Sequence, residues 1–410
     1  MTEDGSLVGW FSGKIKNGFI FELQIRPMFD VILSVAISFT ITFLAIPVII
    51  NVAEMKKLFD MPDERKIHHT AITPLGGIGI FAGFVFGCLL TVNFKSSSEF
   101  QYFIAASLVI FFLGLKDDIL VISPIKKFIG QVLAAFLIIY YGRIQIRSMH
   151  GFFGIYNLPE MFSLLITYFT IIVIINSFNL IDGVDGLAGT LGLMSSLLFG
   201  IYFLNLDMPS YYILAFSLSG SLLAFLIFNF QPAKIFMGDT GSLLIGVVNA
   251  ILAIKFIDPA NGNSQDTVLP VPILESSAAI GFTILMIPLL DTLRVFSIRI
   301  FKRRSPFSPD RNHIHHLLLD RGLSHRSITI LLVSMNLILV ALVYFGRSLG
   351  CTLLILSVFA FFFGFIAISY YARSKPKLIL SKNGKQPENG NVKESKLISL
   401  IKDTILEQKN

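Results

Sequence analysis

The feature that most constrains this chain is a succession of long apolar segments separated by polar connections. There are eleven segments, and several are close to the roughly 20 residues that an α-helix needs to cross a bilayer. Only 14% of the residues are charged, against about 25% in soluble domains. The sequence therefore predicts an all-α polytopic membrane protein with about 11 transmembrane helices. The segments are residues 30–51, 76–93, 100–115, 125–142, 161–178, 187–205, 210–229, 240–257, 277–296, 326–345 and 349–371.

Composition divides the chain into three parts. Residues 1–29 precede the first segment, and their charges do not fit the layout of a signal peptide, so we expect an N-terminal extracytoplasmic segment. Residues 30–371 are the predicted transmembrane domain. Residues 372–410 are polar and basic, which predicts a cytoplasmic C-terminal tail. The two cysteines, Cys88 and Cys351, lie in apolar segments and indicate neither a metal cluster nor a disulfide.

Lysine and arginine are distributed unequally between the two alternating sets of connections. One set, counted with the tail and with Lys126 and Lys127, carries 23 of these residues, and the other set carries 7. Because basic connections stay in the cytoplasm, the sequence predicts that the first set is cytoplasmic and the amino terminus is outside. Every polar cluster described below falls in the cytoplasmic set, so we expect the chemistry on that face.

The first cluster, residues 176–187, lies between two apolar segments and contains Asn176, Asn179, Asp182 and Asp185. Carboxylates at such a junction are costly to desolvate unless they are paired, hydrated or bound to a metal. Oxygen ligands of this kind suit Mg²⁺ or Mn²⁺ better than zinc. A plain polar linker is the simpler interpretation.

A second cluster is the pair Asp117-Asp118, with Lys127 across a short turn. Adjacent carboxylates on a helix point in different directions, so we expect one to act as a base or position a metal while the other accepts hydrogen bonds. The alternative is a capped, solvated helix end. A pair of carboxylates at a membrane helix end, close to lysines, favours a functional site.

A third cluster, residues 236–242, places Asp239 between two glycines, before a helix that we expect to begin near Ser242. Free backbone N–H groups there favour a phosphate, and glycine allows its close approach. An ordinary helix cap explains the same residues.

The last cluster is a basic connection, residues 297–325. The three histidines suggest zinc, but no cysteine accompanies them, and the many arginines favour an anion such as a nucleotide diphosphate. A basic loop that meets acidic lipid is the alternative. Its residues of interest are Arg311, His313, His315 and His316.

In their order along the chain, these clusters resemble the polyprenyl-phosphate N-acetylhexosamine-1-phosphate transferases, glycosyltransferase family 4. The resemblance extends over residues 30–345 and implies ten or eleven transmembrane helices with a cytoplasmic active-site cleft. The matching motifs are Asp117-Asp118, residues 176–187, Phe236-Met-Gly-Asp-Thr-Gly-Ser, His313-Ile-His-His, and Arg65-Lys-Ile-His with Pro74-Leu-Gly-Gly.

The resemblance implies a reaction and a location. An enzyme of the bacterial inner (plasma) membrane would transfer N-acetylhexosamine 1-phosphate from a UDP-sugar to undecaprenyl phosphate, release UMP and start a cell-surface polysaccharide. His313-Ile-His-His resembles the GlcNAc-type enzymes, whereas the peptidoglycan enzymes usually show three consecutive histidines. We therefore expect UDP-GlcNAc, and UDP-GalNAc and UDP-MurNAc-pentapeptide stay open as donors.

The resemblance also implies roles for individual residues. Asn179 and Asp239 are the expected ligands of Mg²⁺, with Mn²⁺ as an alternative. Asp117, Asp118 and Asp182 are the expected catalytic residues, with Asp117 as the base, although a lipid phosphate is already largely ionised near pH 7. The expected substrate-binding residues are Lys127, Asn176, Asp185, Arg311, His313, His315 and His316.

The expected partners are undecaprenyl phosphate, a UDP-N-acetylhexosamine and the lipid bilayer, and no nucleic acid is expected. A second copy of the chain, in a homodimer, is a further candidate partner. An ion-coupled transporter is the alternative from another class of protein. It predicts polar groups in the middle of the spans, whereas the spans of this chain look almost free of charge.

Overall fold

The computed structural model describes residues 5–58, 72–94, 97–258, 274–303 and 312–371, with side chains from residue 27 onward. The predicted tail, residues 372–410, and Arg311 lie outside the described residues, as does the Arg65-Lys-Ile-His motif.

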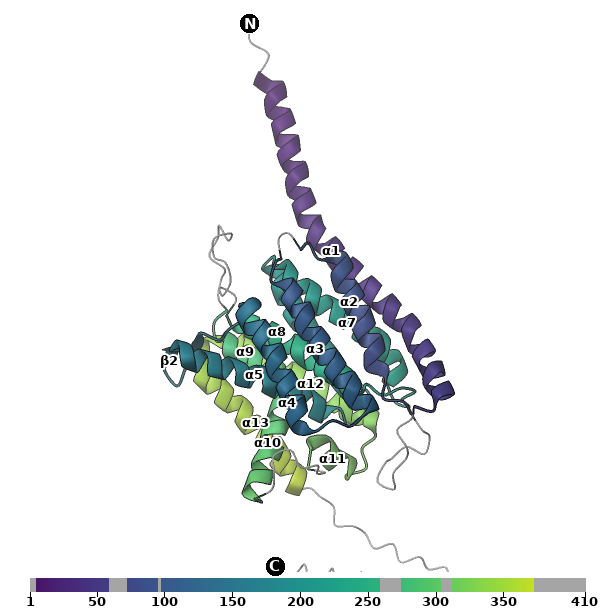
Figure 1. The fold of residues 1–410 in the computed structure, drawn as a ribbon. Coiled ribbons are helices and arrows are strands. Elements are labelled where there is room, and N and C mark those ends of the chain that lie inside the picture. The colour runs from purple at the N-terminus through teal and green to yellow at the C-terminus, as the bar shows by residue number, and fades with distance from the viewer. Residues whose placement is uncertain (1–4, 59–71, 95–96, 259–273, 304–311, 372–410) are drawn as a thin grey trace, which may run out of the picture. The chain divides into compact units, whose positions relative to one another are not determined.

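Helices account for almost all of the regular structure, and each predicted apolar segment is helical (Figure 1). The all-α class is confirmed. One hairpin, which the sequence-based prediction missed, joins β1 to β2 in antiparallel pairing. The elements are α1 (Gly5–Lys56), α2 (Gly76–Thr91), α3 (Phe100–Ile119), α4 (Pro124–Phe136), the π-helical turn η1 (Leu137–Tyr141), β1 (Ser148–Phe152), β2 (Ile155–Asn157), α5 (Glu160–Ile181), α6 (Leu187–Asn205), α7 (Pro209–Asn229), α8 (Gly238–Ile257), α9 (Ser277–Ile284), α10 (Met286–Phe301), α11 (Ile314–Leu319), α12 (His325–Phe345), the 3₁₀ turn η2 (Arg347–Leu349) and α13 (Cys351–Tyr371).

Within the described ranges, eight helices are long and apolar enough to cross a membrane, or nine if the bent pair α9 and α10 forms one span. The polytopic membrane class is therefore confirmed. α2 has only 16 residues and α3 is not among the nine, so the count of eleven spans stays a prediction.

The predicted apolar segment over residues 277–296 is not one straight helix. α9 and α10 meet at an angle of 78°. The break falls at Leu285, and Pro288 follows in the first turn of α10, where its missing N–H breaks no helical hydrogen bond. Proline is tolerated where a helix begins, and the local sequence contains no signal for the size of the angle.

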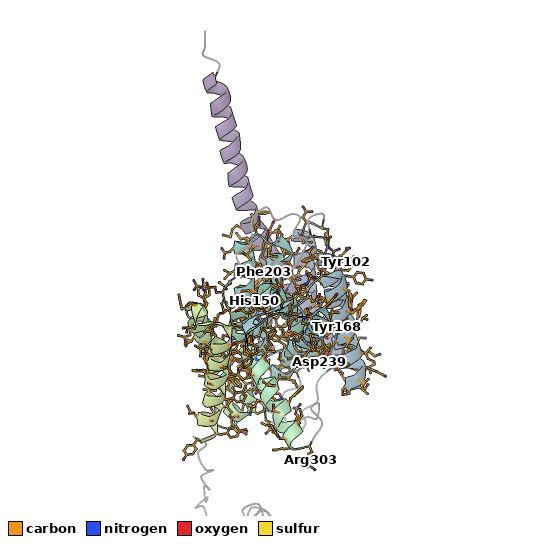
Figure 2. All side chains as sticks on the ribbon, turned by 90° about the vertical axis from the view of Figure 1, so that its left-hand side faces the viewer. Tyr102, His150, Tyr168, Phe203, Asp239 and Arg303 are labelled. Carbon is orange, nitrogen blue, oxygen red and sulfur yellow. The ribbon has the colours of Figure 1, made fainter. Side chains whose placement is uncertain are left out.

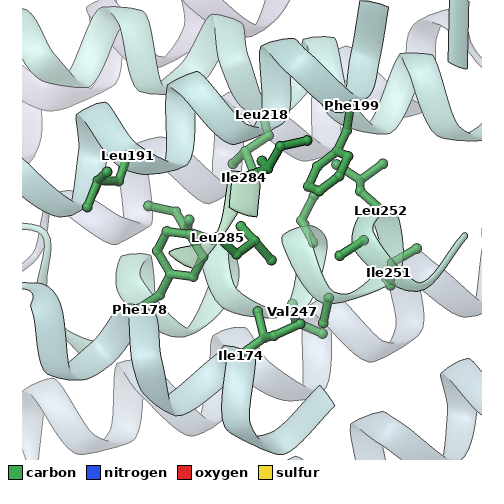
Figure 3. Close-up of a cluster of buried hydrophobic side chains, with 14 of the residues drawn as sticks. Ile174, Phe178, Leu191, Phe199, Leu218, Val247, Ile251, Leu252, Ile284 and Leu285 are labelled. Atoms are coloured by element: carbon green, nitrogen blue, oxygen red, sulfur yellow. The ribbon is translucent and has the colours of Figure 1, made fainter. Parts of the chain in front are cut away.

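The bundle is organised around α8, which packs against α2, α3, α5, α6, α7 and α9. α8 is apolar on all sides, and a helix of that kind has to be surrounded by other helices. In Figure 3, Val247 of α8 lies beside Ile174 of α5 and near Leu285 from the bend. α8 therefore fixes the positions of the helices whose ends carry the polar clusters.

Small residues bring α1, α2 and α7 into close contact. A Cβ atom on Gly83 would lie 2.0 Å from Thr42 Oγ1 and 2.4 Å from the carbonyl oxygen of Ser38, and one on Gly87 would lie 1.9 Å from Ser38 Oγ. Because lipid is as apolar as the side chains, membrane helices associate largely through such close packing.

Gly83→Val should lower the thermal stability of the purified protein in detergent, because the added side chain meets backbone and cannot be accommodated by rotation alone. Overpacking of this kind costs about 1–3 kcal/mol. Gly364→Val is the matched control, since nothing lies within 4 Å of a Cβ atom there. Equal unfolding temperatures for the two variants would contradict the proposed packing.

Candidate active site at the polar end of the bundle

Four helix ends meet at one end of the bundle. α3 ends and α4 begins there, α5 ends, and α8 begins, and hydrogen bonds between side chains connect all four. Asp239 marks this end in Figure 2, with Tyr102 and Phe203 toward the other end. The structure brings Asp117, Asp118, Lys127, Asn179 and Asp239 together at this end of the bundle. The assignment of this end to the cytoplasmic face stays a prediction.

The ammonium group of Lys127 is the centre of this site. Its Nζ lies 3.1 Å from Asp117 Oδ2 and 3.4 Å from Asn179 Oδ1, and it also donates to Asp239 Oδ2. Asn179 in turn donates to Asp239 Oδ1 at 2.7 Å and to Ser242 Oγ at 3.1 Å. Oxygen atoms from three helices therefore converge on one positive charge, and the 28% exposure of the Asp239 side chain leaves the site accessible.

Asp118 points away from Lys127 and caps α8. Its Oδ1 accepts a hydrogen bond from the N–H of Asp239 at 2.7 Å, and its Oδ2 accepts bonds from both the N–H and the hydroxyl group of Thr240. The carboxylate thus binds the positive end of the helix dipole. The two adjacent carboxylates have different environments, as expected, and the catalytic role of Asp118 stays a prediction.

Two expectations about the start of α8 were wrong. The helix begins at Gly238 and not near Ser242, and its first N–H groups bind Asp118 instead of being free for a phosphate. The reason is that the cap comes from another helix, which the local sequence cannot indicate. Gly238 has a φ of +67°, and a Cβ atom there would lie 2.1 Å from the carbonyl oxygen of Pro74.

The turn between α5 and α6 carries Asp182 and Asp185. Burial raises the pKa of Asp182 to about 8, and the carboxylates of Asp239, Asp118 and Asp185 contribute further to this increase. Negative charge is therefore in excess around the turn. A divalent cation would reduce this excess, and the nearby donor atoms are the carboxylate and amide oxygens that Mg²⁺ accepts.

Among the described residues, no group of three or more His, Cys, Asp and Glu side chains has the geometry of a metal site. The oxygens around Lys127 include the amide oxygen of Asn179, which belongs to none of those residue types. Mg²⁺ is typically held by one or two carboxylates together with substrate phosphates and waters. Asp239 and Asn179 fit that kind of site, and the prediction of Mg²⁺ or Mn²⁺ stays a prediction.

Asp185 faces α12. Its Oδ1 lies 3.2 Å from Nδ1 of His325, and its carbonyl oxygen accepts a hydrogen bond from Thr329 Oγ1. Gly186 follows with a φ of +76°, and its N–H donates to Asn229 Oδ1 at 2.9 Å. These contacts hold the turn against α7 and α12, and the expected contact of Asp185 with the nucleotide stays a prediction.

Asn176 lies one helical turn before Asn179 and pairs with Gln131 of α4. The two side-chain amides exchange hydrogen bonds of 2.8 and 3.2 Å, and Asn176 also donates to the carbonyl oxygen of Ile172. Both polar groups of Asn176 therefore have protein partners in this structure. They connect α5 to α4, and a role for Asn176 in substrate binding stays a prediction.

The three histidines gather around α11. The rings of His313 and His315 stack with centroids 5.5 Å apart, and those of His315 and His316 lie 4.3 Å apart. A Cβ atom on Gly183 would lie 2.3 Å from His315 Nε2. The histidine motif therefore packs directly on the turn that carries Asp182, and the assignment of these three histidines to substrate binding stays a prediction.

Asp291 of α10 is a residue of this region that the sequence-based prediction missed. Its Oδ2 lies 2.8 Å from His313 Nδ1, and its Oδ1 accepts hydrogen bonds from the N–H of Ile314 at 2.8 Å and from Arg294 at 3.0 Å. An acidic residue inside an apolar segment is itself a signal of function. The expectation that the spans are almost free of charge is wrong for α10, where Asp291, Arg294 and Arg299 are buried.

Asp291→Asn should destabilise the protein, because it leaves Arg294 buried without its ionised partner and weakens the support of His313. Breaking a buried ion pair costs about 3–5 kcal/mol. Thermal unfolding in detergent measures the effect, with Asp207→Asn on the exposed α6–α7 turn as the matched control. Equal stability of the two variants would exclude the structural role of Asp291.

The pH dependence of stability should change when His315 is replaced. Burial, reinforced by His316, lowers the pKa of His315 to about 3, so the folded protein keeps this ring neutral. The unfolded chain takes up a proton near pH 6.5, and stability must therefore fall as the pH falls below that value. His315→Asn should show a smaller decrease in unfolding temperature between pH 7.5 and pH 5 than the unchanged protein. Parallel decreases would contradict this.

Fold and site together define a class of protein, a polytopic membrane protein with a polar site built on helix ends. The sequence profile described as glycosyl transferase family 4 matches residues 100–257, which include Asp117, Lys127, Asn179 and Asp239.

Named relatives extend the match over most of the chain. A decaprenyl-phosphate N-acetylglucosaminephosphotransferase of Mycobacterium leprae is 31% identical over 326 residues, which cover 75% of this chain and 80% of that protein. A probable undecaprenyl-phosphate N-acetylglucosaminyl 1-phosphate transferase of Bacillus subtilis is 30% identical over 348 residues, 83% of this chain and 92% of the relative. An undecaprenyl-phosphate alpha-N-acetylglucosaminyl 1-phosphate transferase of Haemophilus influenzae is 33% identical over 309 residues, 73% and 82% of the two chains. The chain belongs to glycosyl transferase family 4, the polyprenyl-phosphate N-acetylhexosamine-1-phosphate transferases.

Proposed function

We propose that this protein transfers N-acetylglucosamine 1-phosphate from UDP-GlcNAc to undecaprenyl phosphate and releases UMP. The observation that carries the proposal is the convergence of Asp117, Asn179 and Asp239 on the ammonium group of Lys127. Such a site offers both a positive charge for phosphate and oxygen ligands for a cation. The named relatives support GlcNAc 1-phosphate as the transferred group and a polyprenyl phosphate as the acceptor.

Both substrates are anionic, so the site has to overcome their mutual repulsion. Lys127 is placed to contact a phosphate, because its ammonium group lies at the centre of the site, between Asp117, Asn179 and Asp239. An oxygen of the lipid phosphate attacks the β-phosphorus of the UDP-sugar. The bond from that phosphorus to the bridging oxygen breaks, and the bridging oxygen leaves with UMP. The product is a polyprenyl-diphosphate sugar, which would start a cell-surface polysaccharide.

Mg²⁺ is the proposed cofactor, and Asp239 and Asn179 are the residues that would hold it, with Mn²⁺ as an alternative. When bound, a divalent cation neutralises the charge that accumulates on transferring phosphoryl groups. Asp117 is connected to Asp239 and Asn179 by Lys127, which forms an ion pair with Asp117. Because a lipid phosphate is largely ionised near neutral pH, we assign Asp117 chiefly to orienting Lys127 and the acceptor.

The nucleotide and sugar are proposed to lie toward the histidine motif and the turn at Asp185. The ring of His315 lies against Gly183 of this turn, and His313 stacks on His315. Both rings can provide donors for a diphosphate or a sugar hydroxyl group. The excess of Lys and Arg in one set of connections, 23 against 7 in the other, supports a cytoplasmic site in the bacterial plasma membrane.

Asp239→Asn should abolish most of the transfer. The change removes the charge opposite Lys127 and one proposed cation ligand, and losses of about 10²–10³-fold in kcat are typical when a group that stabilises transition-state charge is removed. UMP release is measured with purified protein, undecaprenyl phosphate and Mg²⁺, using UDP-GlcNAc, UDP-GalNAc and UDP-MurNAc-pentapeptide as separate donors. We expect turnover with UDP-GlcNAc.

The matched control is Asp207→Asn, which makes the same chemical change on the exposed α6–α7 turn and should leave turnover unchanged. Full activity of Asp239→Asn would refute the assignment of the site. UDP-sugar uptake into vesicles without acceptor-dependent UMP release would instead favour the transporter.

A further inference from the structure

A second polar pocket lies at the opposite end of α4 from Lys127. The cavity measures ≈ 420 Å³, and Arg143, Gln145, Arg147 and Glu160 contribute to its lining. Tyr140 and Leu164 supply apolar surface to the same pocket. Two guanidinium groups against one carboxylate give these lining residues a net positive charge.

The helix between the two sites sets their separation. α4 and η1 extend from Pro124 to Tyr141, and at about 1.5 Å per residue the path from Lys127 to Tyr140 measures about 20 Å, most of the roughly 30 Å hydrocarbon thickness of a bilayer. Aromatic rings mark the level of the pocket, since Tyr102 stacks on Tyr141 at 5.1 Å and Tyr140 is 53% exposed. Tyrosine concentrates at membrane interfaces, and Tyr102 lies far from Asp239 in Figure 2. The pocket therefore belongs to the other membrane face.

The sequence builds this pocket by alternation. In the segment after η1, Ile144 and Ile146 are buried in the core while Arg143 and Arg147 are exposed. Both arginines line the same pocket. The N–H of Ile146 donates to Thr167 Oγ1 at 2.9 Å, which fixes the segment to α5.

Backbone conformation at the pocket is unusual in two independent ways. η1 is π-helical, a form that is rare and often found at functional sites. Arg143 has a φ of +53°, a left-handed conformation that costs energy for a residue with a side chain. Both features fall immediately before the alternating segment. They set the direction in which Arg143 leaves the helix, toward the pocket.

We propose that this pocket binds the phosphate of a membrane lipid headgroup from the leaflet opposite the candidate active site. Guanidinium groups form bidentate hydrogen bonds with phosphate oxygens. The first turns of α5 beside the pocket expose Met161, Phe162 and Leu165 to the bilayer, so acyl chains have apolar surface next to the charged head. Free inorganic phosphate offers the same oxygen atoms as a lipid headgroup, but it has no acyl chains to contact the apolar surface of α5. For this reason we assign a lipid.

The test measures binding of phosphatidylglycerol to the purified full-length protein in neutral detergent by native mass spectrometry. Arg143→Gly combined with Arg147→Ala should weaken binding by about tenfold or more, because both charged donors to the phosphate are lost. Glycine is chosen at position 143 because it adopts the positive φ without strain. Arg347→Ala, on the loop between α12 and α13 and outside the pocket, is the matched control.

Further arms separate the ligand sources. Diacylglycerol, which lacks phosphate, should bind no better to the unchanged protein than to the double variant, and inorganic phosphate should compete only at far higher concentration. Transferase turnover of the double variant in detergent should equal that of the unchanged protein, which shows that the variant is folded. Arg147→Lys should bind phosphatidylglycerol with intermediate affinity, because lysine keeps the positive charge but cannot form the bidentate hydrogen bonds of a guanidinium group.

Three results would each overturn the assignment. Equal phosphatidylglycerol binding by the double variant and the Arg347→Ala control would exclude the two arginines. Equal binding of diacylglycerol and phosphatidylglycerol would exclude phosphate recognition, and equally tight binding of inorganic phosphate would make this a site for free phosphate. If the double variant also loses transferase turnover, the single variant Arg143→Gly is measured instead. A phosphatidylglycerol affinity equal to that of the unchanged protein would then contradict the proposal.

Discussion

The capping of α8 by Asp118 is the contact on which the geometry of the site depends. A carboxylate at the end of α3 satisfies the first N–H groups of the most deeply buried helix of the bundle. Without this cap, two backbone donors and a carboxylate would have to be satisfied in some other way at the edge of the bilayer, where unsatisfied polar groups are costly. The cap also holds the start of α8 against the end of α3, which places the side chain of Asp239 beside Lys127 and Asn179.

The clusters are far apart in the sequence but adjacent in space because the side chains at the end of α3 contact two other helices. Asp117 and Asp118 point in different directions from consecutive positions of α3, so one binds Lys127 and the other binds α8. The same helix end therefore supplies a structural contact and a site residue. Lys127 extends the arrangement to α4, and the pairing of Asn176 with Gln131 repeats the α4–α5 contact one turn deeper.

The sequence was sufficient for the apolar segments and for the order of the polar clusters, because both depend on local composition. It was insufficient wherever a partner comes from a distant part of the chain. The start of α8 depends on Asp118, and the support of His313 depends on Asp291, 22 residues earlier. The local sequence likewise contains no signal for the 78° bend between α9 and α10. An acid in an apolar segment was the one signal that would have found Asp291.

Charge in the site favours an order of events. Asp117, Asp118, Asp182, Asp185 and Asp239 lie within the same region, and Lys127 is the cation that contacts two of them. Burial raises the pKa of Asp182 to about 8, and the neighbouring carboxylates contribute further to this increase. A phosphate that approached such a region alone would be repelled, since unit charges at about 4 Å interact by several kcal/mol at the effective dielectric of a protein surface. An anionic substrate in this region therefore needs positive charge close to it. Lys127 supplies one such charge, and the proposed divalent cation would supply more.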